Sequence, residues 1–148
     1  MWIDVRVPFE PNRKLADAYN RAMESSTAEW VLMYDADVFL STNPYWYLMS
    51  LNAIEQLRDK KVGWITAKTN RIGNKSQLCP VPNDSDDLNQ HIDMASKLYK
   101  EKGGTISAAK GSLSGFFILT NKTAWQSVGG FKDQGKGLSA VDNIYSKE

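Results

Sequence analysis

Two spacings of apolar residues alternate along the first half of this 148-residue chain. Apolar and polar positions alternate from Trp2 to Val7 and stop at Pro8, which predicts a half-buried strand of the kind found at a sheet edge. The next apolar residues recur at i, i+3, i+4, i+7 and i+8, as in an amphipathic helix, and they are Leu15, Ala18, Tyr19, Ala22 and Met23. The apolar run Trp30 to Tyr34 has the length of a buried strand. The chain is therefore predicted to open as strand, helix, strand.

A further helix and a further strand follow. Asn43 is a candidate helix cap, with Pro44 at the first helical position. The apolar face of that helix is expected to consist of Tyr47, Leu48, Leu51 and Ile54. Val62 to Thr69 is predicted to be a third strand. Because strands alternate with helices, we predict an α/β fold with a mostly parallel sheet flanked by helices.

The stretch from Asn70 to Asp84 is polar and has no period, and a loop of that length is usually functional or mobile. Ser85, Asp86 and Asp87 then suit a helix start, and Gly103-Gly104 suits its end. The three acids Asp84, Asp86 and Asp87 are also a candidate metal cluster, but their spacing matches no calcium loop, and helix capping accounts for them.

The last part of the chain contains shorter elements. Ile106 to Ala108 is a candidate short strand, and Phe116 to Leu119 reads as a buried one. Thr120 or Asn121 is expected to cap a short helix that ends at Gly129-Gly130-Phe131. A further helix start is predicted at Ser139.

Composition narrows the possible functions. The chain has a length that suits one domain, residues 1–148, and it has the hydrophobic content (42%) of a globular protein. A net charge of +1 gives no broad field for nucleic acid or membranes, and no apolar run reaches the roughly 20 residues of a membrane span. The lone Cys79 and the absence of a secretory leader predict a cytoplasmic protein. One cysteine and one histidine, His91, cannot form a usual zinc site, so any metal site must consist of oxygens.

Asp35 and Asp37 are the first candidate site, because they directly follow the strand Trp30 to Tyr34. Ligands of open α/β sheets collect at the carboxyl ends of strands, and magnesium and manganese prefer oxygen ligands together with substrate phosphates. We therefore interpret Asp35-Ala36-Asp37 as a site for a metal and a nucleotide sugar. The alternative is that both acids only open a turn before the next helix.

The order of these motifs resembles that of family-2 glycosyltransferases of the GT-A fold. The similar segments run from about Asn12 to the end, outside the variable stretch from Asn70 to Lys110. They are Asn12-Arg13-Lys14-Leu15 through Asn20-Arg21, Tyr34-Asp35-Ala36-Asp37, Ser114-Gly115-Phe116-Phe117, Val128-Gly129-Gly130-Phe131 and Val141-Asp142-Asn143. The resemblance implies a GT-A-like (Rossmann-like) fold and the transfer of a sugar from a nucleoside diphosphate sugar to a hydroxyl of a glycan or another acceptor.

The resemblance also implies individual roles. Asp37 would hold a divalent cation, Mn or Mg, that neutralises the diphosphate leaving group. Asp35 would contact the donor ribose or share the metal. Asp142 would be the catalytic base of an inverting transfer, against the alternative of a plain acid at a helix start near Ser139.

Four further residues are candidates for donor binding by the same resemblance. Arg13 and Lys14 would contact the donor base or phosphates, although a solvated first helical turn explains them equally well. Ser114 and Gly115 would border the sugar, since glycine admits a close backbone approach. A plain strand entry is the alternative for this pair.

The chain also departs from the family pattern. The unit that binds the nucleobase is expected to be missing, Val141 stands where the family often has Glu, and no segment follows Glu148 to cover the acceptor. We therefore expect an incomplete domain, whose open sheet edge could pair with a second copy or a partner strand. A catalytically silent binding or assembly module is one alternative function. A haloacid-dehalogenase-like phosphatase, with Asp35 as nucleophile, is another.

Overall fold

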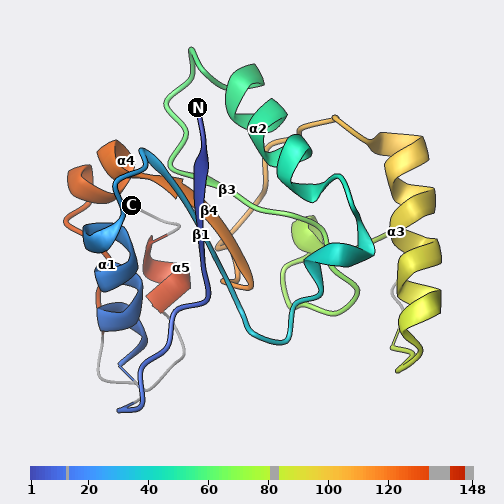
Figure 1. Cartoon of the computed structure of the whole chain (residues 1–148), viewed down its shortest axis with the longest axis horizontal. Helices are drawn as coiled ribbons and strands as arrows, with labels where there is room; N and C mark the ends of the chain where they lie inside the picture. The colour runs from blue at the N-terminus through green and yellow to red at the C-terminus, as the bar shows by residue number, and fades with distance from the viewer. Residues whose placement is uncertain (13, 81–83, 134–140, 146–148) are drawn as a thin grey trace.

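The computed structural model describes residues 1–12, 14–80, 84–133 and 141–145. It contains one mixed sheet flanked by helices (Figure 1). The α-helices and strands along the chain are β1 (Ile3–Arg6), α1 (Leu15–Ser25), β2 (Trp30–Tyr34), α2 (Trp46–Gln56), β3 (Trp64–Ile65), α3 (Leu88–Lys102), β4 (Phe117–Asn121), α4 (Lys122–Ser127) and α5 (Val141–Tyr145). Single 3-10 turns occur at η1 (Leu40–Thr42) and η2 (Lys75–Gln77).

The sheet has the strand order β1-β2-β4-β3, and its directions correct one prediction. β1 and β2 are parallel, with Ile3 opposite Trp30. β4 is antiparallel to both of its neighbours, with Tyr34 of β2 opposite Phe117. The α/β class is thus confirmed, but the prediction of a mostly parallel sheet was wrong.

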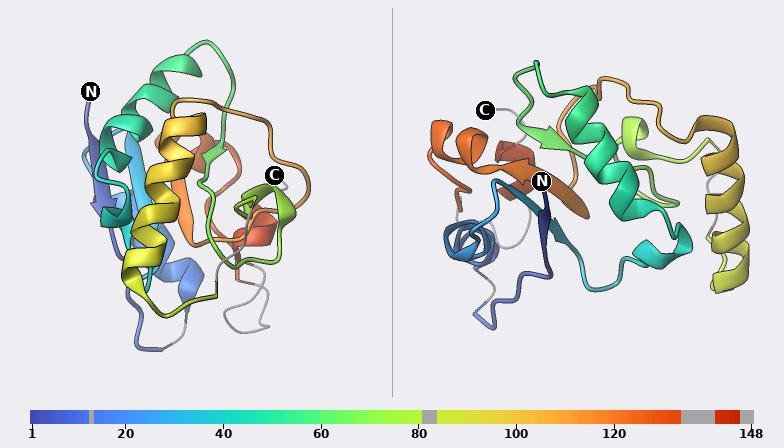
Figure 2. Two further views of the ribbon diagram at one scale, coloured as in Figure 1. Left: turned by 90° about the vertical axis from the view of Figure 1, so that its right-hand side faces the viewer. Right: turned by 45° about the horizontal axis from the view of Figure 1, so that its top comes forward.

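α3 does not pack on the sheet. It lies at the edge of the molecule, beside η1 and the start of α2, and none of its residues is buried (Figure 2). Tyr99 of α3 stacks on Tyr45 with ring centroids 4.9 Å apart. After α3 the chain re-enters the sheet at the carboxyl end of β2 and runs antiparallel to β2 and β3 as β4.

Each face of the sheet has its own apolar core. Val31 and Met33 of β2 pack with α1 and α5, whereas Leu32 packs on the opposite face with α2. This split follows from the strand period of two, which sends alternate side chains to opposite faces. α1 closes the first core with the apolar stripe that its sequence period predicted, and α2 packs on the opposite face of the sheet (Figure 1). Of the four residues predicted for the apolar face of α2, Tyr47, Leu51 and Ile54 lie in the second core. Leu48 is exposed, so its assignment to that face was wrong.

Several boundaries differ from the predicted ones. The predicted strand 62–69 has only two strand residues, because the carbonyl groups of Val62 and Gly63 accept hydrogen bonds from side chains of β4. Residues 106–108 form no strand. α2 begins at Trp46, and Asn43 caps the preceding turn through the amide of Tyr45.

Other local predictions are confirmed. Asp87 caps α3 by accepting from the amide of Asn89, and Asn121 caps α4 by accepting from that of Ala124. Of the three acids Asp84, Asp86 and Asp87, for which helix capping was predicted, Asp87 is thus confirmed as a helix cap. No helix in the described part of the chain is long and apolar enough to cross a membrane.

Candidate functional site

Asp35 and Asp37 lie where β2 ends, as the apolar run predicts. The ladder between β2 and β4 continues one residue past the strand, because the amide of Asp35 donates to the carbonyl oxygen of Phe116 at 3.2 Å. The carbonyl oxygen of Asp35 then accepts from the amide of Val38 at 3.0 Å and closes a turn. Both aspartates are exposed on this turn. The turn interpretation and the interpretation as a ligand site are therefore compatible, since backbone groups form the turn and both residues are exposed.

Asp142 reaches the same end of the sheet from α5. Its Oδ2 atom accepts a hydrogen bond from the amide of Gly115 at 2.7 Å, one residue before the Phe116 that pairs with Asp35. A side chain at position 115 has no room, because a Cβ atom there would lie 2.8 Å from the Cβ of Asp142. Gly115 is thus the point at which the end of β2 and the start of α5 meet. The antiparallel direction of β4 creates this meeting point.

The carboxylates at this end of the sheet influence one another. The pKa of Asp35 is raised, first by loss of water around its carboxylate and then by the negative charges of Asp37 and Asp142. The pKa of the buried Tyr19 on α1 is also raised, by burial and by the charges of Asp35 and Asp142. Asp35, Asp37 and Asp142 are hereafter called the acid corner. Like charges repel, so a cation or hydrogen-bond donors placed between them would be stabilised.

The acid corner is not a complete metal cage. Among the described residues, no group of three or more His, Cys, Asp or Glu side chains is arranged to hold a metal ion. Magnesium and manganese, however, are commonly bound by one or two carboxylates while substrate phosphates and water supply the other oxygens. Asp35 and Asp37 are exposed oxygen donors, the environment of Asp35 disfavours its negative charge, and the pair fits that second kind of site.

Ser114 is held by a residue that the sequence did not single out. The side chain of Gln77 is completely buried, accepts from the amide of Ser114 at 2.8 Å and donates to its carbonyl oxygen at 2.9 Å. Asn74 donates to the carbonyl oxygens of Lys110 and Ser112 in the same way. This part of the polar stretch, expected to be functional or mobile, thus fastens the segment that leads into β4.

Asn20 on α1 is the second residue that sequence reasoning missed. Its Oδ1 accepts from the amide of Phe131 at 2.8 Å and from the indole of Trp125 at 2.9 Å, while its Nδ2 donates to the carbonyl oxygen of Phe131 at 2.9 Å. Gly130 has a φ of +81°, and a Cβ atom there would lie 2.9 Å from Oδ1 of Asn20. The Gly-Gly-Phe turn is therefore shaped around this amide. Phe131 then stacks on Tyr145 of α5, the helix that contains Asp142.

The two basic candidates are Arg13 and Lys14. Arg13 lies outside the described residues. Lys14 is exposed just before α1, and its positive charge helps to lower the pKa of Glu10. Its carbonyl oxygen accepts from the amide of Ala18, which is the role of a first-turn residue. The solvated first turn thus accounts for what the structure describes of Lys14.

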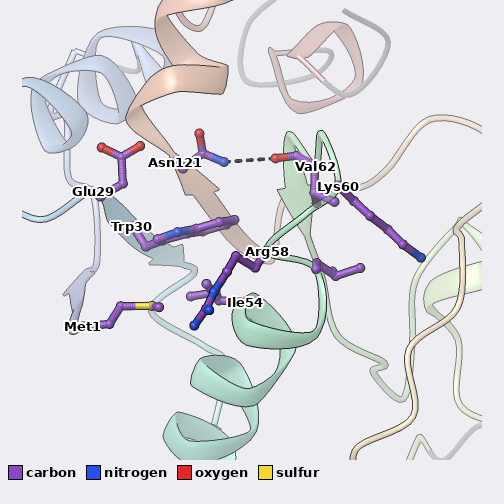
Figure 3. Close-up of a pocket in the computed structure, with 9 residues that line it drawn as sticks. Met1, Glu29, Trp30, Ile54, Arg58, Lys60, Val62 and Asn121 are labelled. Carbon is purple, nitrogen blue, oxygen red and sulfur yellow. Dashed lines mark hydrogen bonds between the residues drawn. The ribbon is translucent and has the colours of Figure 1, made fainter.

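A shallow hollow of about 230 Å³ lies at the opposite end of β2 (Figure 3). Trp30, the first residue of β2, contributes to its lining together with Ile54 and the cationic side chains of Arg58 and Lys60. Because Trp30 and Asp35 stand at opposite ends of the strand, this hollow is separate from the acid corner.

Comparisons of the chain with protein families, with curated proteins and with solved structures found no match.

Proposed function

We propose that the chain is a GT-A-like domain that transfers a sugar from a nucleoside diphosphate sugar to an acceptor hydroxyl. The observation that carries the proposal is the acid corner. Asp35 and Asp37 come from the tip of β2, and Asp142 comes from a helix more than a hundred residues later in the chain, yet the charges of Asp37 and Asp142 both raise the pKa of Asp35. A carboxyl group whose pKa is raised by acids from a distant segment is typical of functional sites.

The proposed roles follow from exposure and hydrogen bonding. Asp35 and Asp37 are the exposed pair and would contact the donor diphosphate and ribose, with a divalent cation that, when bound, neutralises the leaving group. Ser114 and Gly115 border the same end of the sheet. Gly115 keeps one oxygen of Asp142 in place, which orients the carboxylate as a base. Lys14 and Arg13 remain proposals for the donor phosphates.

The proposed reaction is a single displacement. The acceptor oxygen attacks the anomeric carbon while the bond from that carbon to the diphosphate oxygen breaks, and the bonding pair leaves with the diphosphate. The acceptor proton passes to the carboxylate of Asp142. Attack from the side opposite the leaving group inverts the anomeric centre. Fixing Asp142 through a backbone amide serves this step, because rates depend steeply on the placement of the base.

Thermal unfolding in the presence of manganese and a panel of nucleoside diphosphates tests the proposal. A nucleotide present at 100 times its dissociation constant stabilises the folded state by about 2.7 kcal/mol. For a domain of about 150 residues this raises the Tm by about 5–10 °C. Asp37→Ala is expected to abolish the manganese-dependent shift, and Asp142→Asn is expected to retain it but to lose sugar transfer.

The matched control for Asp37→Ala is Asp59→Ala. Asp59 is also an exposed aspartate, but it follows α2, next to Arg58 and Lys60 of the hollow at the other end of β2. It is expected to leave the nucleotide-dependent Tm shift unchanged. The proposal is rejected if no nucleoside diphosphate raises the Tm with manganese present, or if Asp37→Ala and Asp59→Ala reduce the shift equally.

A catalytically silent assembly module is the second candidate, favoured by the free edge of the sheet at β1. That edge is short, its first amide donates to the hydroxyl of Tyr47, and it carries the Asp4–Arg6 ion pair. Concentration-dependent dimerisation without any nucleotide effect would favour this function. A dehalogenase-like phosphatase has less support, because the charges that shift the pKa of Asp35 within the described part of the chain are those of the acids Asp37 and Asp142, whereas its chemistry requires a lysine.

A further inference from the structure

Among the described residues, the side chain of Gln77 is completely buried and has protein partners for all of its amide hydrogen-bonding groups. Its residue exposure is 0%, and its amide group uses both of its donors and its acceptor. Nε2 donates to Oγ1 of Thr66 and to the carbonyl oxygen of Ser114, each at 2.9 Å, while Oε1 accepts from the amide of Ser114 at 2.8 Å. The side chain thus pairs with Ser114 as a neighbouring strand would pair with it.

The backbone of Gln77 is fixed as firmly as its side chain. Its carbonyl oxygen accepts from the amide of Thr69 at 2.8 Å, and its own amide donates to the carbonyl oxygen of Asn74 at 3.0 Å. Thr69 in turn forms an isolated bridge with Leu78. Gln77 is therefore a rigid anchor, and any residue that it binds is held relative to the sheet.

The contact to Ser114 leads directly to the acid corner. The peptide plane that joins Ser114 to Gly115 contains both the carbonyl oxygen bound by Gln77 and the amide that donates to Asp142 at 2.7 Å. Because a peptide unit is planar and stiff, fixing its oxygen also fixes the direction of its N–H bond. Gln77 and Asp142 thus hold opposite ends of one rigid unit.

We propose that Gln77 is a positioning residue for Asp142, acting through the Ser114–Gly115 peptide. Its catalytic consequence rests on the function proposed above, whereas its structural consequence does not. Without Gln77 the peptide can rotate, the Gly115 amide leaves Oδ2 of Asp142, and the carboxylate loses its fixed orientation. A misplacement of this size slows transfer without changing how tightly the donor binds.

Three variants separate this role from general support of the fold. Gln77→Met keeps the volume but removes both bonds to Ser114. Thr66→Val removes the other partner of the Gln77 amide and leaves both Ser114 bonds intact, so it is the matched control. Gln77→Glu can pair with Ser114 only when it is protonated, because the charged form has no hydrogen to donate to the Ser114 carbonyl oxygen.

The first measurement is amide exchange and the proton shift of Gly115 by NMR, which require no activity. Both hydrogen bonds to Ser114 are lost in Gln77→Met, so the Gly115 amide is expected to exchange about 10- to 100-fold faster, with Thr66→Val close to the unaltered protein. The second measurement is kinetic. We expect kcat to fall by a similar factor in Gln77→Met with the donor KM unchanged.

The pH dependence of Gln77→Glu distinguishes a positioning role of Gln77 from a purely structural one. Burial raises the pKa of a glutamic acid, so its transfer rate and Gly115 protection, relative to the unaltered protein, are expected to recover as the pH falls. If Gln77→Met fails to fold, the pH dependence of Gln77→Glu decides whether Gln77 positions Asp142. Unchanged Gly115 exchange in Gln77→Met, or equal effects of Gln77→Met and Thr66→Val, would overturn the proposal. If all variants and the unaltered protein lack transfer but Gly115 exchange changes as expected, the proposed function fails and the positioning contact stands.

Discussion

Gly115→Ala gives the sharpest test of how the acid corner is built. The added Cβ atom would lie 2.8 Å from the Cβ of Asp142, 3.2 Å from Cδ1 of Ile118 and 3.3 Å from Oδ2 of Asp142. Two of these contacts are with the residue whose carboxylate accepts from the Gly115 amide. Relief of the overlap therefore requires α5 to move away from β4, which lengthens the 2.7 Å hydrogen bond as well.

The magnitude follows from the two losses. Forcing one methyl group into a packed site costs about 1–3 kcal/mol, and a hydrogen bond to a charged group contributes about 1.5–3 kcal/mol when it is lost completely. Movement of α5 away from β4 relieves the steric overlap but weakens the hydrogen bond between Gly115 and Asp142. The full costs of both are therefore not incurred together. We expect a loss of about 2 kcal/mol in the free energy of unfolding and a Tm lower by about 4–8 °C.

Urea unfolding, with Gly73→Ala as control, measures this loss. A Cβ atom at position 73 has no heavy atom within 4 Å, so this variant loses no native contact. It restricts the unfolded chain and is expected to be neutral or to gain up to about 1 kcal/mol. If Gly115→Ala unfolds at the same urea concentration as Gly73→Ala, then Gly115 and Asp142 are not packed together, and the acid corner does not have the geometry described.

Two further predictions concern the same region. The folded state raises the pKa of Asp35, so its proton stabilises the fold at low pH and that contribution disappears as the pH rises through the folded-state pKa. Asp35→Asn is therefore expected to stabilise the protein at pH 7, and the gain should vanish below about pH 4; an equal gain at both pH values in urea unfolding would contradict this. Asn20→Ala removes three hydrogen bonds at the Gly-Gly-Phe turn and is expected to cost about 3 kcal/mol, whereas the exposed Asn52→Ala should change stability by less than about 0.5 kcal/mol. Equal unfolding midpoints of these two variants would show that Asn20 does not support the turn.

The elements that were predictable are those with a long periodic signal. The run Trp30 to Tyr34 coincides with β2, and the stripe that begins at Leu15 coincides with α1, because each buries a regular set of side chains. Strand direction has no such signal. β4 is antiparallel to both of its neighbours, and its own apolar run does not indicate this. α3 also has an amphipathic sequence, although none of its residues is buried.

The supports of the candidate site were hidden for a different reason. Gln77 lies in an irregular polar stretch, and Asn20 is one polar residue on an otherwise ordinary helix. Their importance comes from partners more than thirty residues away in the sequence, which no local pattern records. Asp35 and Asp37 were found because they follow a strand. The proximity of Asp142 was expected only from the resemblance, and its described contact is with Gly115.

The late position of β4 in the chain has a consequence for folding during synthesis. β4 is the only bridge between β2 and β3 in the described sheet, so β3 has no strand to pair with until residue 121 has been made. Until then one edge of β2 has unpaired backbone groups, and unpaired strand edges make incompletely folded chains prone to aggregation. Pairing across about 85 residues of intervening sequence also delays sheet closure relative to helix formation. A ribosome that pauses before β4 is complete would thus carry a chain whose earlier helices can form but whose sheet lacks the strand that joins β2 to β3.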